Sequence, residues 1–161
     1  MKMIKLIVAA DDRYGIAKDG KIPWHSKEDF KFFRETTIGS GNNVVMMGRK
    51  TMESLPKFPL PHRKNIVITS KPDPQHDYEV NSLDKIAMFV KKYDDVFIIG
   101  GGYVYQESIK LNLAKEIFIS RIPGDFNCDK FLNIEDIKQY YVLDEIKKFE
   151  TFNVEVWHLI K

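Results

Sequence analysis

The feature that most constrains the fold is a series of five short apolar runs, each rich in Val, Ile or Phe. They are Ile4–Ala10, Asn43–Met47, Asn65–Thr69, Val96–Ile99 and Glu116–Ile122. Near-continuous runs of this length are typical of strands covered on both faces of a sheet. Helices are expected between them, at Ser26–Ile38, about Lys50–Ser54, Ser82–Lys92 and about Gly102–Ile109. This alternation predicts an α/β fold whose mostly parallel, twisted central sheet is flanked by helices.

The C-terminal part of the chain follows a different pattern. Tyr140–Phe149 and Phe152–Ile160 are two apolar stretches around a short polar turn, which predicts an antiparallel hairpin. No repeat, low-complexity segment or linker divides the 161 residues. The length suits one domain, so we expect residues 1–161 to form a single unit.

Charge and cysteine content narrow the classes of function. The net charge of +2 is small and evenly spread, so nucleic acid is not an expected partner. Cys128 is the only cysteine and the four histidines are scattered, so neither a disulfide nor a metal site is expected. The apolar N-terminal stretch is interrupted by Asp11-Asp12-Arg13 and is too short for a membrane span. The expectation is a cytoplasmic protein without a membrane partner.

Asp29 is the acidic residue with the most unusual surroundings. It lies in the first predicted helix, three residues after Ser26, a suitable N-cap. An acid here can simply favour the positive end of the helix. At about 100° per residue, however, Asp29 shares a face with Phe30, Phe33 and Thr37. Such a carboxylate is either costly or functional, and it could hydrogen-bond a flat, nitrogen-rich ligand; periodicity leaves both explanations open.

Three predicted strands are followed by glycines, hydroxyls or cations. The segments are Gly48-Arg49-Lys50-Thr51, Thr69-Ser70-Lys71 and Gly100-Gly101-Gly102. Glycines let the backbone approach a ligand, and free N–H groups at a helix start favour phosphate. Each segment alone is compatible with a tight turn or a surface charge. Together they predict a dinucleotide that lies across the carboxyl ends of the strands.

Several short motifs occur in a characteristic order. They are Gly15-Ile16-Ala17 through Ile22-Pro23-Trp24, Asp29-Phe30 with Phe33, Met47-Gly48-Arg49-Lys50-Thr51, Leu60-Pro61 before Arg63-Lys64-Asn65, Ile99-Gly100-Gly101-Gly102 with Tyr105, and Asp125-Phe126 with Asp129. In this order and spacing they resemble the dihydrofolate reductase family, from about Ile4 to Leu159. The resemblance implies NADPH-dependent reduction of 7,8-dihydrofolate to tetrahydrofolate, with hydride transfer to C6 and protonation of N5. It also implies a monomer that binds antifolate inhibitors and supports one-carbon metabolism and thymidylate synthesis.

The resemblance implies roles on the substrate side. Asp29 matches the acid that hydrogen-bonds the amino-pyrimidine edge of the pterin and promotes protonation of N5. Trp24 matches the tryptophan beside that acid, and Ser120 takes the place of a supporting threonine. Arg63 matches the arginine that binds the α-carboxylate of the folate tail. The other implied substrate-binding residues are Ile7, Val8, Phe30, Phe33, Arg34, Leu55, Leu60 and Ile99.

The resemblance also implies roles on the cofactor side. Arg49, Thr69, Ser70 and Lys71 match the 2′-phosphate site, which favours NADPH over NADH, whereas Lys50 and Thr51 match residues that face the pyrophosphate. Gly100-Gly101 matches a cis peptide bond, which glycine on both sides makes sterically easier. The nicotinamide is expected near Ala9, Ile16 and Tyr105. The other implied cofactor-binding residues are Gly48, Gly102, Tyr103 and Val104.

Some positions depart from the family pattern. His62 stands where glycine often precedes the arginine, and Asp129-Lys130 stands where Asp-Thr is usual. In addition, Arg121 follows Ser120, and Pro123-Gly124 comes shortly after. The Asp129-Lys130 departure bears on the contacts that stabilise the mobile loop around Ile16–Ile22, which is part of the expected lid from Asp11 to Trp24. Two other functions are compatible with parts of the pattern: a reductase of the same fold that acts on a riboflavin precursor, and a non-catalytic dinucleotide-binding module. Asp29 beside Trp24, together with Arg63, favours the dihydrofolate reductase.

Overall fold

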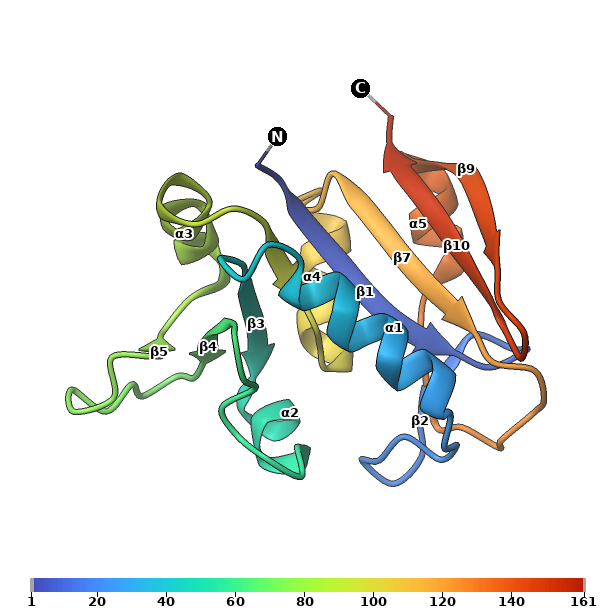
Figure 1. The fold of residues 1–161 in the computed structure, drawn as a ribbon, viewed down its shortest axis with the longest axis horizontal. Coiled ribbons are helices and arrows are strands. Elements are labelled where there is room, and N and C mark those ends of the chain that lie inside the picture. The colour runs from blue at the N-terminus through green and yellow to red at the C-terminus, as the bar shows by residue number, and fades with distance from the viewer. Residues whose placement is uncertain (1, 161) are drawn as a thin grey trace.

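The computed structural model describes residues 2–160 and is built around an eight-stranded sheet of order β5-β4-β3-β6-β1-β7-β10-β9 (Figure 1). The strands from β5 to β7 are paired in parallel, whereas β10 is antiparallel to both β7 and β9. The bounds are β1 (Ile4–Ala10), β3 (Val44–Gly48), β4 (Lys64–Ile68), β5 (Glu79–Val80), β6 (Val96–Ile98), β7 (Glu116–Arg121), β9 (Tyr141–Lys148) and β10 (Asn153–Leu159). A second, two-stranded sheet pairs β2 (Gly15–Ala17) with β8 (Lys130–Phe131).

Helices cover both faces of the large sheet. Their bounds are α1 (Lys27–Ile38), α2 (Arg49–Ser54), α3 (Ile86–Lys92), α4 (Gly102–Lys110) and α5 (Ile134–Tyr140), with a 3₁₀ turn, η1 (Leu83–Lys85), before α3. Figure 1 shows α1 crossing one face in front of β1, with α4 behind the sheet. One apolar cluster includes residues of α3, α4 and α5, and the other includes Phe32 and Phe33 of α1. Alternate residues of β1 and β7 therefore face two separate cores.

The predicted fold class is confirmed, including the C-terminal antiparallel pair. The observed β1 has the predicted bounds, because its apolar run ends abruptly at charged residues. The predicted helix Ser82–Lys92 is divided between η1 and α3. Tyr140 ends α5 and does not begin a strand, a correction of the predicted hairpin. The elements β2, β5, β8 and α5 were not predicted, because the three strands have only two or three residues and α5 has a single buried side chain, Ile137, which leaves no periodic pattern.

The strand order explains how the predicted nucleotide segments meet. β4, β3 and β6 are adjacent and parallel, so their carboxyl ends lie along one edge of the sheet. The three segments that begin at Gly48, Thr69 and Gly100 follow these ends. Within residues 2–160, no helix combines the length and apolar character needed to cross a membrane.

Candidate active site

Asp29 is buried on α1, with 7% of its surface exposed. The helix is capped by Ser26, whose Oγ accepts a hydrogen bond of 3.1 Å from the Asp29 backbone N–H. The side chain that caps this helix is therefore the serine hydroxyl, which removes the need for a capping carboxylate. Asp29 and Thr37, which periodicity placed on one face of α1, are its buried residues, whereas Phe30, placed on the same face, is 43% exposed.

The surroundings of Asp29 favour its neutral form. Burial raises the pKa of this carboxyl, while the Ser120 hydroxyl on β7 lowers it in part. The buried Tyr105 hydroxyl donates a hydrogen bond of 2.8 Å to the Ile7 carbonyl. Burial, and then the charge of Asp29, raise the pKa of Tyr105. Asp29 thus interacts with the Ser120 hydroxyl of β7 and with Tyr105 of α4, whose ring packs in the core on the other face of the sheet.

Trp24 lies at the end of the predicted lid and is also buried. Its ring packs edge-on against Phe126, with 5.3 Å between centroids. Its Nε1–H is buried and has no hydrogen-bond partner in residues 2–160. An unpaired buried donor is costly, so this group is available to a polar ligand.

Most of the predicted apolar walls belong to the α1 side of the sheet. Ile7, Trp24 and Ile99 are in the buried cluster of that side, and Ala9, Phe33, Leu55 and Leu60 pack against it. Phe30 is 43% exposed, and Arg34 is exposed, so both lie at the outer surface of this side. The side chain of Val8 faces the opposite core, which also contains Ile16 and Tyr105, so the structure does not bring it to the same wall as Ile7.

Arg63 is held near the last turn of α1. Its Nη1 donates to Thr37 Oγ1 at 3.0 Å, and its Nε donates to the Pro61 carbonyl at 2.8 Å. Burial, and then the neighbouring Arg34, lower the pKa of Arg63. Neither arginine forms an ion pair with an acid in the described part of the chain. Two nearby cations without an acidic partner fit a ligand carboxylate.

Two polar residues that position Arg63 were not assigned a role from the sequence. Thr37 accepts from Arg63 and donates to the Phe33 carbonyl at 2.7 Å. Asn65 is buried, and its amide bonds the Leu60 N–H and carbonyl at 2.9 Å each and the Arg63 carbonyl at 3.0 Å. Asn65 lies within the Arg63-Lys64-Asn65 motif, and this position is the sequence feature that could have indicated its role.

The structure explains why glycine is common at the position of His62. The φ angle of His62 is +62°, in the left-handed region that glycine adopts most easily. The histidine therefore carries a local backbone cost beside Arg63. Beside the departure at Lys130, Asp129 contacts the loop. Asp129 donates its N–H to the Ala17 carbonyl at 2.9 Å, and its Oδ2 accepts from the Asp19 N–H at 2.9 Å.

Two glycine segments meet at the carboxyl ends of β3 and β6. The Gly48 N–H donates to the Gly100 carbonyl at 2.8 Å, and the Gly100–Gly101 peptide bond is cis. A Cβ at Gly48 would lie 3.2 Å from Val104, and one at Gly101 would lie 3.2 Å from Thr51 Oγ1. Glycine thus allows the close approach of these chains. Gly101 also caps α4 without a side chain, so the first N–H groups of that helix face no capping group.

The outer cofactor residues are much more exposed. Arg49, Lys50, Ser70 and Lys71 are exposed, and Tyr103 is 76% exposed. Arg49 makes only a 3.3 Å contact with Glu53 of its own helix. Thr69 differs because it is buried, and its N–H is paired with the Val80 carbonyl of β5.

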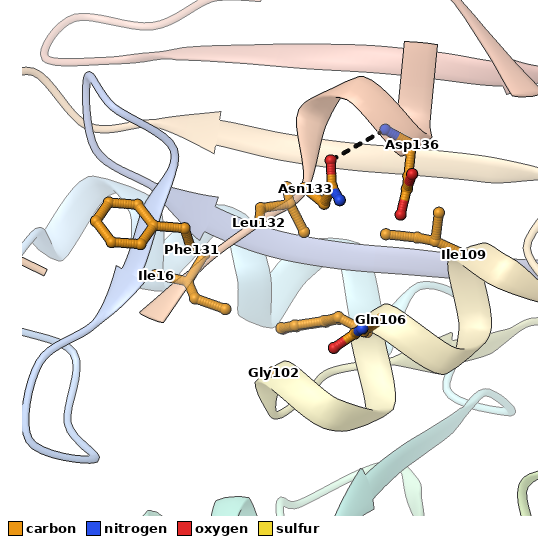
Figure 2. A pocket seen from close by; sticks show the side chains of 9 residues that line it. Ile16, Gly102, Gln106, Ile109, Phe131, Leu132, Asn133 and Asp136 are labelled. Atoms are coloured by element: carbon orange, nitrogen blue, oxygen red, sulfur yellow. Dashed lines mark hydrogen bonds between the residues drawn. The ribbon is translucent and has the colours of Figure 1, made fainter. Parts of the chain in front are cut away.

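A small cavity is lined in part by Ile16 and Tyr105, two residues of the predicted nicotinamide position. Figure 2 shows Ile16 of β2 and Gly102 and Gln106 of α4 on one side, with Asn133 and Asp136 at the start of α5 on the other. Asn133 Oδ1 caps α5 through the Asp136 N–H at 3.2 Å. The cavity is therefore lined by residues of β2, α4, β8 and the start of α5, and Ile16 lies near Gly102.

Comparison with known proteins identifies the family. The family model described as dihydrofolate reductase matches residues 3–157. The chain belongs to the dihydrofolate reductase family. A dihydrofolate reductase of Bacillus subtilis is 36% identical over 130 residues, which cover 80% of this chain and 74% of that protein. A dihydrofolate reductase from Enterococcus faecalis, solved in complex with NADP(H) and RAB-propyl, has a TM-score of 0.82 and 31% identity, with 99% of this chain and 97% of that chain covered.

Longer members of the dihydrofolate reductase family also match. A bifunctional dihydrofolate reductase-thymidylate synthase of Arabidopsis thaliana is 35% identical over 153 residues, which cover 84% of this chain. The chain spans only 27% to 35% of the length of such bifunctional relatives. Within residues 2–160, no group of three or more His, Cys, Asp or Glu side chains is placed to hold a metal ion.

Proposed function

We propose that this chain catalyses the NADPH-dependent reduction of 7,8-dihydrofolate to 5,6,7,8-tetrahydrofolate. The observation that carries the proposal is the spacing of two polar sites on α1. Asp29 lies buried near the start of the helix, and Thr37 holds Arg63 eight residues later. At 1.5 Å per residue these positions are about 12 Å apart along the axis. That spacing suits a ligand with a nitrogen-rich ring at one end and a carboxylate tail at the other.

In this proposal Asp29 binds the amino-pyrimidine edge of the pterin and promotes protonation of N5. The raised pKa of its carboxyl supports this role, because burial makes the carboxyl easier to protonate and the protonated form can donate as well as accept a hydrogen bond. Trp24 lies in the buried cluster that contains Ile7 and Ile99, and its N–H, unpaired within residues 2–160, would bind a polar group near the acid. Ile7, Phe33 and Ile99 supply the apolar walls against which a flat ring packs.

The residues of the cofactor side fit a phosphorylated dinucleotide. Gly48, Gly100 and Gly101 form a close-packed backbone surface, and the start of α4 offers uncapped N–H groups. Arg49, Ser70 and Lys71 would contact the 2′-phosphate, and Lys50 and Thr51 the pyrophosphate. NADPH, when bound, supplies the hydride for C6. Ala9, Ile16 and Tyr105 would orient the nicotinamide.

Positioning and exclusion of water would supply most of the rate in this proposal. Asp29 is the evident proton-handling residue of the site, so the rest of the pocket acts by holding two flat rings together. The loop from Asp11 to Trp24 covers them as a lid. The proposal extends to antifolate inhibitors as ligands of the same pocket, and to a monomeric cytoplasmic enzyme that supports one-carbon metabolism and thymidylate synthesis.

The test is an absorbance assay of NADPH oxidation with purified protein. Dihydrofolate should be reduced at a rate typical of enzymes, about 1 to 1,000 per second, with a KM in the micromolar range. The riboflavin-precursor substrate of the related reductases should give no oxidation. NADPH binding without oxidation in the presence of dihydrofolate would overturn the proposal in favour of a non-catalytic module. Analytical ultracentrifugation tests the monomer.

A further inference from the structure

The first residues of the lid are attached to the sheet by one arginine, Arg121. It is the last residue of β7 and follows Ser120, the neighbour of Asp29. Its Nη2 donates to the Asp11 carbonyl at 3.1 Å and to the Asp12 carbonyl at 3.2 Å. One end of a single guanidinium thus binds two successive carbonyls at the point where the chain leaves β1 and enters the lid.

The same guanidinium stacks on Tyr14, two residues further along the lid. The Arg121 Cζ lies 3.7 Å from the centroid of the Tyr14 ring. Tyr14 has a φ of +61°, a left-handed conformation that is unfavourable for a bulky residue. This turn therefore needs stabilising contacts, and a planar cation on an aromatic face is one of the more favourable.

Arg121 is itself held from the side of the sheet. Its Nη1 makes an ion pair of 2.8 Å with Glu155 Oε2 of β10, and the side chains are only 22% and 13% exposed. The other oxygen of Glu155 accepts a 3.0 Å hydrogen bond from Trp157 Nε1. Glu155 is thereby fixed in orientation, and Arg121 with it. The cluster formed by Arg121, Glu155, Tyr14 and Trp157 is here called the lid anchor.

A second set of bonds completes the attachment on the opposite side of the turn. Asp11 Oδ1 accepts from the N–H groups of Arg13 and Gly15 at 2.9 and 2.8 Å, and Oδ2 accepts from the Phe126 N–H at 3.1 Å. Burial alone would raise the pKa of Asp11, but these donors outweigh it and lower the pKa. The carboxylate is therefore charged at neutral pH. Ile16, which lies beside Gly102 in Figure 2, follows this turn directly.

We propose that Arg121 is a positioning residue of the reductase, because it fixes the root of the lid so that Ile16 and the rest of the lid close over the cofactor. The inference rests on the proposed function for its kinetic consequence, although the geometry of the lid anchor stands by itself. The role requires the guanidinium. A lysine could pair with Glu155 but could not also bridge two carbonyls and stack on Tyr14.

The test compares three variants with the wild-type chain. Arg121→Lys keeps the positive charge, and the double variant Arg121→Met, Glu155→Gln removes the ion pair without leaving a buried charge. Arg13→Met is the matched control, because this arginine is in the same loop but is 67% exposed, with an ion pair of 3.8 Å to the exposed Asp125. Hydrogen–deuterium exchange of peptides covering residues 11–24 measures the lid root without any need for turnover.

The expected result is faster exchange at residues 11–24 in both Arg121 variants, greatest in the double variant, with the β1 and β7 peptides unchanged. The KM for NADPH should rise and kcat fall, each by about tenfold in the double variant and less in Arg121→Lys, while dihydrofolate affinity stays within about twofold. A 4-deuterated NADPH should show a larger isotope effect on kcat, because hydride transfer becomes more limiting.

Wild-type exchange rates at residues 11–24 in Arg121→Lys would overturn the inference, even if the double variant proved too unstable to purify. Loss of thermal stability with unchanged kcat and KM well below the melting temperature would also overturn it, since that is the result of a purely structural role. The failure of wild-type protein to reduce dihydrofolate would instead refute the proposed function, and the exchange experiment would still decide the role of Arg121.

Discussion

The proposed substrate half of the site (Trp24, Asp29, Thr37, Arg63 and Ser120) consists of buried or half-buried side chains, whereas the proposed outer cofactor half (Arg49, Lys50, Ser70 and Lys71) is exposed. Asp29 and Arg63 already have defined neighbours on α1 and β7. Arg49 contacts only a glutamate of its own helix. The pterin is therefore expected to meet a prearranged pocket, and the 2′-phosphate a set of side chains that become ordered on binding.

The largest effect on activity is expected from Asp29→Asn. A small effect would contradict the contrast between the two halves of the site. Turnover at neutral pH should fall by about 100- to 10,000-fold, because the variant loses the proton-handling group. The dissociation constant for NADPH, measured by fluorescence titration, should stay within about twofold. Near-normal kcat in this variant would show that Asp29 does not direct the proton.

Arg63→Lys should raise the KM for dihydrofolate by about tenfold or more, because lysine cannot form the bidentate contact with a carboxylate. The value of kcat should change little, since the tail is remote from the reacting ring. Thr37→Val should give a smaller rise in the same constant, because it removes the 3.0 Å hydrogen bond that orients Arg63. Steady-state kinetics with varied dihydrofolate measures both. A fall in kcat as large as the rise in KM would show that the contact between Arg63 and the folate tail also positions the reacting ring.

Arg49→Gln should raise the KM for NADPH by about tenfold, roughly the loss of one charge-assisted contact, and leave the KM for NADH unchanged. Glu53→Gln is the informative partner, because it releases Arg49 from its present contact. That variant should bind NADPH as tightly as the wild type or slightly more tightly. Weaker NADPH binding by Glu53→Gln would mean that the exposed pair is itself part of the prearranged site.

The difference in stability between Asp29→Asn and the wild type should depend on pH, because Asp29 is buried. Since burial raises the folded-state pKa of Asp29, the folded protein holds this proton more tightly than the unfolded chain does. Below about pH 4 the carboxyl is protonated in both states, so the two proteins should have similar melting temperatures. As the pH rises through the folded pKa, the wild type loses stability and the variant does not. A variant that melts below the wild type at pH 8 would contradict the buried-acid assignment.

The smallest expected effect is that of His62→Gly. Glycine removes the cost of a φ of +62° but adds entropy to the unfolded chain, so the net gain in unfolding free energy should be about 0.5 kcal/mol. Chemical denaturation measures it, and kcat and both KM values should stay within about twofold. A loss of stability would mean that the imidazole makes a contact worth more than the backbone strain.

Prediction from the sequence succeeded where the apolar pattern lies within a single strand or helix. The bounds of β1 and the buried face of α1 with Asp29 and Thr37 follow from hydrophobic periodicity within a single segment. The helix α5 was missed because seven residues with one buried side chain, Ile137, give no repeating pattern. The individual roles of Arg49 and Arg63 came from the family resemblance, since an isolated arginine in a loop has no periodic signature.

By itself, the sequence determined the α/β class, the parallel strands, the acid on an aromatic helix face and the order of motifs that marks the family. Only the tertiary structure decided that burial raises the pKa of Asp29, that Thr37 holds Arg63 and that Arg121 binds the root of the lid. The physical reason is that several of these contacts join residues far apart in the chain. Arg121 and Asp11, for example, are separated by 110 positions. Local patterning shows which face of an element is apolar, but the pairing of a buried charge depends on what the fold places opposite it.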